Sequence, residues 1–573
     1  MSIIQKFDRN VQHLDSVIAK CYSDAIEKRN EMNDFYLLVC VLLGFVVYFI
    51  YNGLTAKGKL RRRLCAKFGR APSGDYQSTA IPLFWQAYSA AHPSVKNVDA
   101  VTWNDLAMDD VFAHINACES TIGQDYLYAM LHVTNVSATE LEQRERLMAA
   151  FSDTETRLSA QMPLAKLGKR ISTRLSVLLF EEDAPDTMPK MTLLLLYAAL
   201  PWCSLLLLPF SAQLALFVLL CGMANNVYQY FQIRKRSENA IETTGYFLAA
   251  VSCAKKLAKT LAPNCPTLSQ KFAKSTQPFH AIGMSAQFVS GGVQTDATMV
   301  ADIIGMITLL PLLEYAKTRR ILLQNRAAML QLYCLLGETD AAISVLSYRE
   351  SVDFFAVPQF THTHSIKCTQ LVHPLLAQPV ANDASIMRDW LLTGSNASGK
   401  STFIKAIAIN LILAQTIHTC TAGTFSLGAA PVITSMAIAD DVIDGESYFV
   451  AEIKSMRRIV VLADTNCACY CFIDEILKGT NTEERVAASI AVLEHLAGTK
   501  ALCMAATHDM ELPNALGAQY ENHHFCEQMT ADGITFDYKL KEGVSTTRNA
   551  IRLLDYYHFP PSVIAHATSL AGE

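Results

Sequence analysis

Nine consecutive residues have the types and spacing of a loop that binds phosphate groups. They fit the pattern G-x-x-x-x-G-K-[ST] and are Gly394, Ser395, Asn396, Ala397, Ser398, Gly399, Lys400, Ser401 and Thr402. In such a loop, backbone N–H groups surround the phosphates at the start of a helix. Lys400 would place a positive charge on the outer phosphates, and the Ser401 hydroxyl would hold Mg²⁺. The pattern predicts a nucleotide-binding site. The alternative is a chance match in a Gly/Ser turn that binds no nucleotide.

The residues on either side of this loop predict the elements that would position it. Trp390–Thr393 is a short apolar run that is typical of a buried strand, and residues 403–415 have the apolar periodicity of a helix. The strand would lead into the loop and the helix would leave it. This is the context that a phosphate-binding loop requires.

Two further predicted strands end in residues that could complete a site for nucleotide hydrolysis. Residues 469–473 are apolar and precede Asp474 and Glu475. Asp474 would hold the Mg²⁺ shell, and Glu475 would polarise the attacking water. Residues 501–506 precede His508, which could sense the γ-phosphate, although a structural histidine is the alternative. Loop, acidic pair and histidine in this order predict an α/β ATPase of the ABC type that uses ATP and Mg²⁺.

Four segments resemble the ATPase domain of the DNA mismatch repair MutS family. They are the Asn-containing phosphate loop, A-D-D-V-I-D-G-E-S-Y-F-V-A-E at 439–452, D-E-I-L-K-G-T-N-T at 474–482 and A-T-H at 506–508. They follow one another in family order, between His373-Pro374 and the segment that ends at Ala565. The resemblance implies an ATPase that works as a homodimer with two composite sites.

The same resemblance suggests roles for two residues outside the loop and the acidic pair. Ser447 matches the serine that reaches the γ-phosphate of the partner subunit, and the alternative is a plain helix-capping serine. Tyr538 lies in residues 536–540, which occupy the strand where the family stacks a ring on adenine, and the alternative is an ordinary strand aromatic. Two departures, Tyr448 for Thr and Asn481 for Ser, keep a hydrogen-bonding group, so we expect altered rather than abolished turnover.

The resemblance extends more faintly toward the N-terminus. Residues 120–131 and 140–144 resemble the family's helical core, and residues 336–341 resemble the stretch where its lever helices return to the ATPase. The two N-terminal modules of the family have no counterpart here. No Phe-x-Glu, the pattern that contacts mismatches, occurs in the first 100 residues. The resemblance therefore does not extend to mismatch recognition.

Hydropathy predicts a membrane anchor near the N-terminus. Mean hydropathy is +0.20 and 51% of the residues are apolar, which is high for a soluble protein. Phe35–Tyr51 contains no charge and would extend about 26 Å as a helix, close to the roughly 30 Å of a bilayer core. A buried core helix is the alternative. A cleaved signal peptide is not expected, because a polar tail precedes the segment.

A second apolar region predicts two more membrane passes. Residues 191–228 contain no charge, and Pro209 favours a hairpin with passes at 191–208 and 212–229. Positive residues flank the spans: Lys57, Lys59, Arg61, Arg62, Arg63, Lys67, Arg70, Lys190, Arg234, Lys235 and Arg236. The positive-inside rule then predicts an integral protein of the cytoplasmic (inner) membrane, with residues 55–190 and 230–573 in the cytosol.

Charge gives little support for nucleic acid as a partner of the whole chain. The net charge is −5 and the pI is near 6.3, and the basic run at 57–70 is expected beside a membrane span in any case. The 16 cysteines are scattered through the chain. We therefore expect reduced thiols and no metal other than Mg²⁺.

The predicted fold is an α/β P-loop ATPase domain joined to a mostly helical, core-and-lever-like region with about three transmembrane helices. The expected order is a polar tail (1–34), a transmembrane helix (35–51), a helical core segment (52–190), a transmembrane hairpin (191–229), a helical lever segment (230–350) and the ATPase domain (351–573).

Three functions compete. The first is a membrane-anchored ATPase that clamps double-stranded DNA. The second uses the same ATPase to move its helical arms for a membrane or protein partner, without DNA. The third, half of an exporter, is disfavoured because residues 289–294, which imitate an exporter signature, precede the phosphate loop instead of following it.

Overall fold

The computed structural model describes residues 48, 55–72, 81–134, 136–170, 175–180, 190–282, 303–395, 398–436, 448–477, 480–530, 533–545 and 558–570. The chain forms two compact units, residues 1–68 and residues 69–573. In the first unit, residues 55–67 are helical. The predicted polar tail lies outside the described residues, as does the predicted span at 35–51 except for Tyr48, which is helical.

The first part of the second unit is helical, as the sequence predicts. Its helices before the hairpin are α3 (Ile81–Ala91), α4 (Ala100–Asp105), α5 (Met108–Ile115), α6 (Thr121–His132), α7 (Ala138–Phe151), α8 (Thr154–Leu167) and α9 (Leu175–Phe180). Those after it include α12 (Pro266–Ser275), α14 (Leu310–Gln324) and α15 (Arg326–Ser351). Local signals start several of them: Ser137 and Glu140 form a capping box on α7, and Asp153 caps α8.

Helix α15 lies in the core of this region, beside α6. Its buried Asp340 accepts hydrogen bonds from the backbone N–H groups of Glu119 (3.1 Å) and Ser120 (2.9 Å), at the start of α6. Gly123 permits this contact, because a Cβ there would lie 2.2 Å from the Asp340 carboxylate. Burial raises the pKa of Asp340 to about 6, even though these hydrogen bonds favour the charged form.

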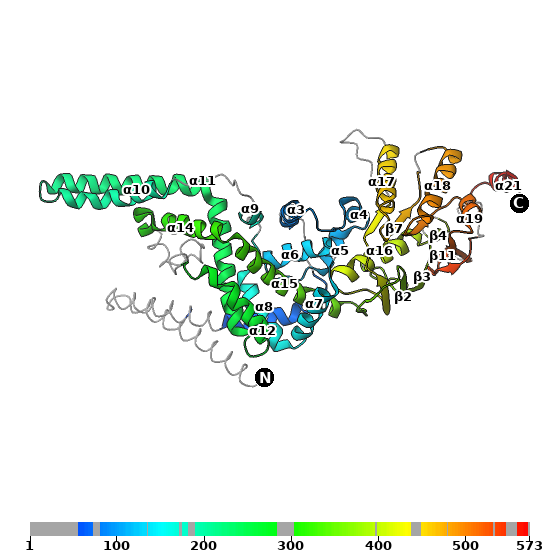
Figure 1. The fold of residues 1–573 in the computed structure, drawn as a ribbon, viewed down its shortest axis with the longest axis horizontal. Coiled ribbons are helices and arrows are strands. Elements are labelled where there is room, and N and C mark those ends of the chain that lie inside the picture. The colour runs from blue at the N-terminus through cyan, green and yellow to red at the C-terminus, as the bar shows by residue number, and fades with distance from the viewer. Residues whose placement is uncertain are drawn as a thin grey trace, which may run out of the picture. The chain divides into compact units, whose positions relative to one another are not determined.

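The predicted hairpin is formed by α10 (Met191–Cys203), a short 3-10 turn (Ser204–Leu207) and the first part of α11 (Ala212–Thr260), which run side by side (Figure 1). Gly222 of α11 lets the helices approach closely, since a Cβ there would lie 3.1 Å from the Pro201 backbone. Large apolar side chains are exposed along both helices, among them Leu196, Trp202, Leu206, Phe210, Leu216 and Phe217.

Helix α11 does not end where the predicted hairpin ends at residue 229. It continues through a change of backbone direction at Ser237 (φ −115°, ψ 16°) into the helical core, where Tyr246, Phe247 and Leu257 are buried. One continuous element therefore joins the exposed apolar hairpin to the packed helical region.

Two described helices are long and apolar enough to cross a membrane, Ala212–Thr260 and Arg326–Ser351. Their surroundings differ: 22% of the apolar window is buried in the first helix and 72% in the second. The second, α15, is therefore a core helix of the protein. The apolar helix Met191–Leu207 is shorter and pairs with the first.

The C-terminal part is α/β. A four-stranded sheet has the order β1-β5-β2-β3, and a six-stranded sheet has the order β12-β9-β4-β8-β7-β6. The strands of the first are Gln359–Thr361, Thr424–Gly428, Ile366–Leu371 and Asn382–Ile386. Those of the second are Lys541–Glu542, Glu521–His524, Trp390–Thr393, Ala501–Ala506, Cys469–Asp474 and Val432–Ser435. In the larger sheet only β12 is antiparallel to its neighbour.

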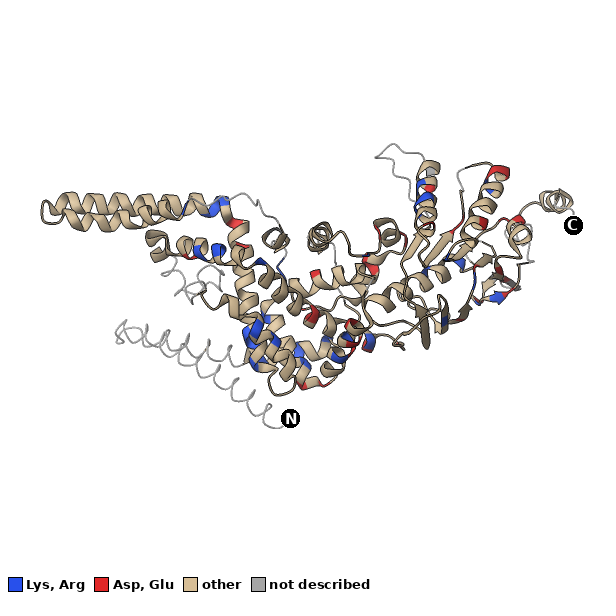
Figure 2. Ribbon diagram, viewed as in Figure 1, with Lys and Arg blue, Asp and Glu red and all other residues tan. Residues whose placement is uncertain are grey.

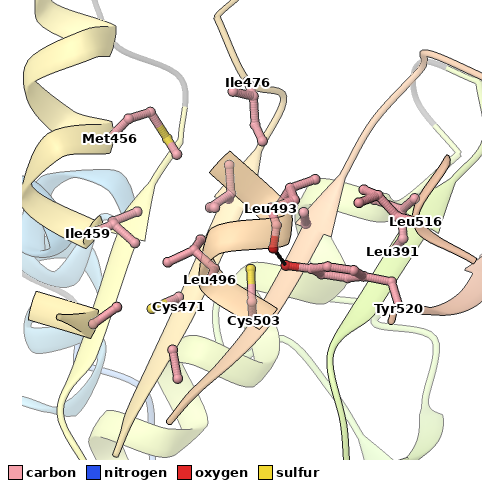
Figure 3. Packing of buried hydrophobic residues seen from close by; sticks show 14 of the residues in the cluster. Leu391, Met456, Ile459, Cys471, Ile476, Leu493, Leu496, Cys503, Leu516 and Tyr520 are labelled. Atoms are coloured by element: carbon pink, nitrogen blue, oxygen red, sulfur yellow. Dashed lines mark hydrogen bonds between the residues drawn. The ribbon is translucent and has the colours of Figure 1, made fainter. Parts of the chain in front are cut away.

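One face of the larger sheet is covered by α17 (Tyr448–Ala463), α18 (Thr482–Ala497) and α19 (Glu511–Leu516). Figure 3 shows Met456, Leu493 and Leu516 of these helices gathered over Cys471 and Cys503 of the strands. The buried Tyr520 hydroxyl donates to the Leu493 carbonyl (2.9 Å). Alternate residues of the strands thus supply this core, as expected for a sheet covered on both faces.

Helix α16 (Lys400–Thr416) packs against strands β6, β7 and β8 and also against α6 of the helical region. Most of its residues are buried, which explains why it is apolar all round rather than along one stripe. The helix that follows the phosphate loop is therefore enclosed between the sheet and the helical region.

The far end of α16 is tied to the helical region by a cluster of charged groups around Arg349. The Arg349 guanidinium pairs with both carboxylate oxygens of Glu145 on α7 (2.8 Å each). It also donates to the Thr419 hydroxyl (2.9 Å) and to the His418 carbonyl (2.8 Å), just beyond α16. Arg144 of α7 donates to the carbonyl of Thr416, the last residue of α16.

Candidate functional site

The candidate site lies at the carboxyl ends of three neighbouring parallel strands. β8 lies between β4 and β7, and Ala506 at its end is in register with Leu392 of β4 and Asp474 of β7. The loops that leave these strands carry the predicted phosphate loop, the acidic pair and His508. Segments that are far apart in the sequence thus meet at one edge, where α/β sheets commonly bind ligands.

Two glycines give the phosphate loop its path. Gly394 has φ +139° and Gly399 has φ +109°, both in the region that favours glycine. A Cβ on Gly394 would lie 2.4 Å from the Phe525 carbonyl oxygen, and one on Gly399 would lie 3.1 Å from the Tyr538 ring. Larger residues would therefore strain the loop or displace its neighbours. Asn396 and Ala397 lie outside the described residues.

Lys400 directs its ammonium group at the loop that precedes it. The residue is buried, and its Nζ donates to the carbonyls of Gly394 (2.6 Å) and Ser395 (2.8 Å). The positive charge is therefore held beside the backbone of the predicted phosphate loop, and its contact with the outer phosphates stays a prediction.

Glu475 and His508 form a close pair. The distance between Glu475 Oε1 and His508 Nε2 is 2.7 Å, and the same His508 nitrogen lies 3.4 Å from Lys400 Nζ. A carboxylate only accepts hydrogen bonds, so Nε2 carries the hydrogen and donates to Glu475. Because Nε2 carries a hydrogen, it has no lone pair that could accept a hydrogen bond from the Lys400 ammonium. Lys400 is therefore a positive charge close to the His508 ring and not its hydrogen-bond donor. The structure thus brings three predicted site residues together.

The backbone at Glu475 is unusual. Its φ is +60°, which is uncommon for a residue with a side chain, and its N–H donates to the Ala506 carbonyl (3.0 Å). Conformations of this kind cost on the order of 1–3 kcal/mol and occur preferentially at functional sites. The bend turns the chain immediately after β7 and places the Glu475 carboxylate within reach of His508.

The loop that carries His508 is anchored on both sides. The Thr507 N–H donates to the Leu392 carbonyl at the end of β4 (2.9 Å). Asp509 forms a two-point ion pair with Arg485 of α18, with contacts of 2.6 and 3.0 Å. Arg485 was not among the residues that the sequence singled out. No local sequence pattern relates Arg485, on a helix, to Asp509, which lies 24 positions later in a loop.

The described residues fit a nucleoside triphosphate with Mg²⁺. Ser398 Oγ is buried and has no hydrogen-bond partner among the described residues, although it lies within the phosphate loop. Ser401 at the start of α16 and Asp474 at the end of β7 are both partly accessible. One hydroxyl and one carboxylate suit Mg²⁺, which keeps several waters and binds substrate phosphates. No group of three or more His, Cys, Asp or Glu in the described ranges could hold another metal.

Tyr538 lies beside the phosphate loop but not within a strand. Strand β11 (Gly533–Phe536) ends two residues earlier, and Tyr538 has φ +52°. Its carbonyl accepts from Asn382 Nδ2 (2.9 Å), and its ring is the nearest neighbour of Gly399. The prediction that residues 536–540 form a strand is therefore wrong, both for the adenine-stacking candidate and for the alternative of an ordinary strand aromatic. Stacking on adenine stays a prediction.

A contact that the sequence did not predict closes the other side of the loop. The Ser395 hydroxyl donates to Glu527 Oε2 (2.5 Å), at the start of β10 (Glu527–Thr530). Glu527 is buried, whereas carboxylates usually are not unless they are paired. The two residues are 132 positions apart in the chain, so no sequence pattern could relate them.

Ser447 lies outside the described residues, and α17 begins at the next residue, Tyr448. Arg458 ties α17 to the helical region. It forms an ion pair with Asp99 and donates to the Thr102 hydroxyl (3.3 Å) of α4. Helix α4 in turn lies against the edge strand β6. The helix that follows Ser447 is therefore joined to the helical region.

Comparisons with known proteins identify relatives of the C-terminal part. Residues 390–573 match the family model of MutS domain V. The chain is 33% identical to MutS protein homolog 4 of Mus musculus over 265 residues, which is 42% of this chain and 27% of that protein. It is 31% identical to the DNA mismatch repair protein MutS of Natronomonas pharaonis over 194 residues, 32% of this chain and 22% of that protein.

A longer match extends into the helical region. The chain is 26% identical to the DNA mismatch repair protein MutS of Chlamydia muridarum over 367 residues, 60% of this chain and 43% of that protein. The chain thus covers less than half of the length of these relatives.

Proposed function

Because this chain belongs to the MutS family through its C-terminal domain, we propose that it is a Mg²⁺-dependent ATPase anchored in a membrane. The observation that carries the proposal is the meeting of Lys400, Glu475 and His508 at the ends of β4, β7 and β8, with contacts of 2.7 and 3.4 Å. The test is ATP hydrolysis by the purified full-length protein and its loss in variants of this triad.

In the proposed mechanism, each residue has a separate task. Lys400 and the loop backbone bind the β- and γ-phosphates of ATP, and Glu475 polarises the attacking water. Ser401 and Asp474 would hold Mg²⁺, which supplies positive charge to the phosphates when bound. His508 donates to Glu475 and so orients its carboxylate. The same ring lies beside Lys400, which suits a residue that senses the γ-phosphate.

We further propose that two copies of the chain share their ATP sites through Ser447. Support comes from the resemblance of residues 439–452 to the family segment and from α17, which begins directly after Ser447. A helix start that carries a hydroxyl suits an anion supplied by another subunit.

Mixing Ser447→Ala protein with Lys400→Ala protein is expected to restore part of the ATPase activity. If Ser447 acts on the partner's site, both lesions meet at one site of the heterodimer and the other site is intact. Steady-state phosphate release after mixing measures the recovery. If heterodimers form and no activity returns, Ser447 does not act in this way.

Membrane anchoring rests on the apolar hairpin of α10 and α11. It has no charged residue between Lys190 and Arg234, and its large apolar side chains are exposed. Figure 2 shows the hairpin free of Lys, Arg, Asp and Glu, with basic residues where it ends. In water this surface would favour aggregation, whereas in a bilayer it is solvated by lipid.

We expect the protein to remain in the membrane pellet after extraction with alkaline carbonate. A protease added to intact cells should leave the ATPase domain uncut, because the positive-inside rule places it in the cytosol. Release by carbonate would refute anchoring. Cleavage of the ATPase domain from outside would refute the orientation alone.

Two versions of this function differ in the partner. In the first the ATPase clamps double-stranded DNA, as the names of its mismatch repair relatives suggest. In the second it moves its helical arms for a membrane or protein partner, and this version is favoured by α11, which continues from the hairpin into the helical core. DNA binding to the solubilised protein, measured at increasing salt, separates them. Binding that weakens steeply with salt supports the first version, and no binding at low salt supports the second.

A further inference from the structure

Residues 303–313 form a broken helix that contains no charged residue. The chain is helical at 303–308, Leu309 has φ +54°, and α14 begins at Leu310 with Pro311 in its first turn. In the sequence, this stretch of 11 uncharged residues lies between Asp302 and Glu314. It is too short for a membrane span, so hydropathy did not single it out.

Other groups satisfy the polar backbone atoms at the break. In an unbroken helix the Ile307 carbonyl would accept from the N–H of residue 311, but Pro311 has none. Asn226 Nδ2 of α11 donates to this carbonyl instead (2.8 Å). The Thr308 hydroxyl donates to the Ile304 carbonyl (2.8 Å), and the N–H groups of Leu312 and Leu313 donate to the Leu309 carbonyl (3.1 Å each).

Asn226 is itself completely buried, in the apolar part of α11. A buried amide that meets a carbonyl freed by a helix break is the arrangement that a lipid environment requires, because no water is available there for an unpaired carbonyl. In water the same carbonyl could be hydrated without this contact. The bond therefore meets one requirement of a break in the hydrocarbon layer or at its border, but a buried carbonyl in a water-soluble protein is satisfied in the same way, and Asn226 Oδ1 has no hydrogen-bond partner among the described residues.

Apolar contacts hold the broken helix against the base of the hairpin. Leu309 and Leu312 are buried in a cluster with Leu194 of α10 and with Tyr230 and Ile233 of α11. The break is compact because Gly305 lies directly against the Pro311 ring, where a Cβ would be 2.8 Å from Pro311 Cγ. The segment is thus part of the same packed module as the hairpin.

The side of the segment that does not contact the hairpin is apolar and exposed. Ile303, Ile304 and Leu310 are each about half exposed, like the side chains of the neighbouring hairpin. The next charged residues on α14 are Glu314, Lys317, Arg319 and Arg320. Figure 2 shows basic residues on α14 as well as at the end of the hairpin. Basic residues thus follow both apolar surfaces toward the side that the charge rule places in the cytosol.

We propose that residues 303–313 are a further membrane-embedded element, a broken helix that enters the lipid beside the hairpin and is docked there by Asn226. The proposal rests on the membrane anchoring proposed above. The partner of the exposed face is the acyl-chain region of a bilayer, because this face continues the lipid-exposed surface of the hairpin.

Tryptophan quenching by brominated phospholipids tests this in the full-length protein reconstituted into vesicles. Of the four tryptophans, Trp85, Trp103 and Trp390 are buried, and Trp202 is exposed on the hairpin. In a Trp202→Phe background, Ile304→Trp is expected to be quenched at least half as strongly as Trp202 is in the wild-type protein. Ile303→Trp is a second reporter in case the first variant does not fold.

Val461→Trp on α17, made in the same Trp202→Phe background, is the matched control, because Val461 and Ile304 are each 55% exposed. We expect no quenching above background for this control. If Trp202 is quenched but neither the Ile303→Trp nor the Ile304→Trp variant exceeds the control, the membrane insertion of residues 303–313 is refuted and the anchoring of the hairpin stands. If Trp202 itself is not quenched, the anchoring of the hairpin fails as well.

Asn226→Leu tests the docking contact. The leucine keeps the apolar environment but removes the donor to the Ile307 carbonyl. We expect quenching of the tryptophan introduced by Ile304→Trp to fall by at least half, while quenching of Trp202 in the otherwise wild-type chain is unchanged. Unchanged quenching of the introduced tryptophan would refute the role of Asn226.

Discussion

Replacement of Glu475 by Gln is expected to leave ATP bound and to slow its hydrolysis by about 10²–10⁴-fold. The Gln side chain has the same shape, and its amide oxygen still accepts from His508 Nε2, which lies 2.7 Å from Glu475 Oε1 in the wild type. It has no carboxylate to polarise water. The loss is therefore chemical, with the loop geometry retained. Single-turnover phosphate release and nucleotide affinity should be measured on the same preparation.

Lys400→Ala should fail at an earlier step. The ammonium group lies against the carbonyls of Gly394 and Ser395, so its removal takes the fixed positive charge out of the phosphate loop. We expect nucleotide affinity to fall along with hydrolysis. The control for Glu475→Gln is Glu494→Gln. Glu494 is an exposed carboxylate on α18, so this variant should hydrolyse ATP at the wild-type rate. If the Glu475→Gln protein also hydrolysed ATP at the wild-type rate, Glu475 would have no part in the mechanism.

The strands that carry the site could be predicted well from the sequence. The predicted bounds of β4 and β8 match the structure, and β7 includes one residue more, Asp474. These strands are short apolar runs that end in polar residues, so composition alone defines them. Helix α16 begins at Lys400 rather than at Phe403, because the last turn of the phosphate loop already has helical geometry.

The contacts that connect the loops could not be predicted. His508 reaches Glu475, Ser395 reaches Glu527 and Asn382 reaches Tyr538 across long stretches of chain. The spacing of apolar residues indicates which face of an element is buried, but it does not indicate which loops come together. The order of the strands in the sheet determines which loops come together. The order of the motifs along the chain predicted the site only because the family resemblance implied how those motifs are arranged in space.

The apolar helices show a second limit of sequence patterns. Helices α11 and α15 pass the same test of length and composition, yet α15 is covered by its neighbours and the hairpin part of α11 is not. Hydropathy counts apolar residues but does not report what covers them. The broken helix at 303–313 was missed for the opposite reason, since it is too short to be counted although it lies beside the hairpin.

Arg349→Met is expected to destabilise the protein by about 3 kcal/mol, which for the compact unit 69–573 corresponds to a fall in melting temperature of roughly 3 °C. The Arg349 side chain is 4% exposed and makes four hydrogen bonds to Glu145, Thr419 and the His418 carbonyl. Methionine fills similar space but leaves the partly buried carboxylate without its cation. Thermal unfolding of the solubilised protein measures the change.

The control for this substitution lies on the same helix as Glu145. Arg146 pairs with Glu142 at 3.3 Å, but its side chain is 78% exposed and the pair joins neighbouring turns of α7. Arg146→Met should cost only about 0.3–0.5 kcal/mol, because water already screens that pair. Equal losses in the two variants would mean that the cluster around Arg349 does not join the helical region to the C-terminal α/β region.

The pH dependence gives an independent check of the same cluster. Burial acts to raise the pKa of Glu145, but the hydrogen bonds from Arg349 and His418 outweigh it and lower that pKa to about 2. A lowered pKa in the folded state contributes stability above the ordinary value near 4.5, and this stability is lost as the pH falls toward 2. The difference in melting temperature between the wild type and Arg349→Met should therefore be largest near pH 7 and should narrow below pH 4.5. A difference that stays constant over this range would show that the carboxylate of Glu145 is not what Arg349 stabilises. The contact of Arg144 with the Thr416 carbonyl would then still connect α7 to the far end of α16.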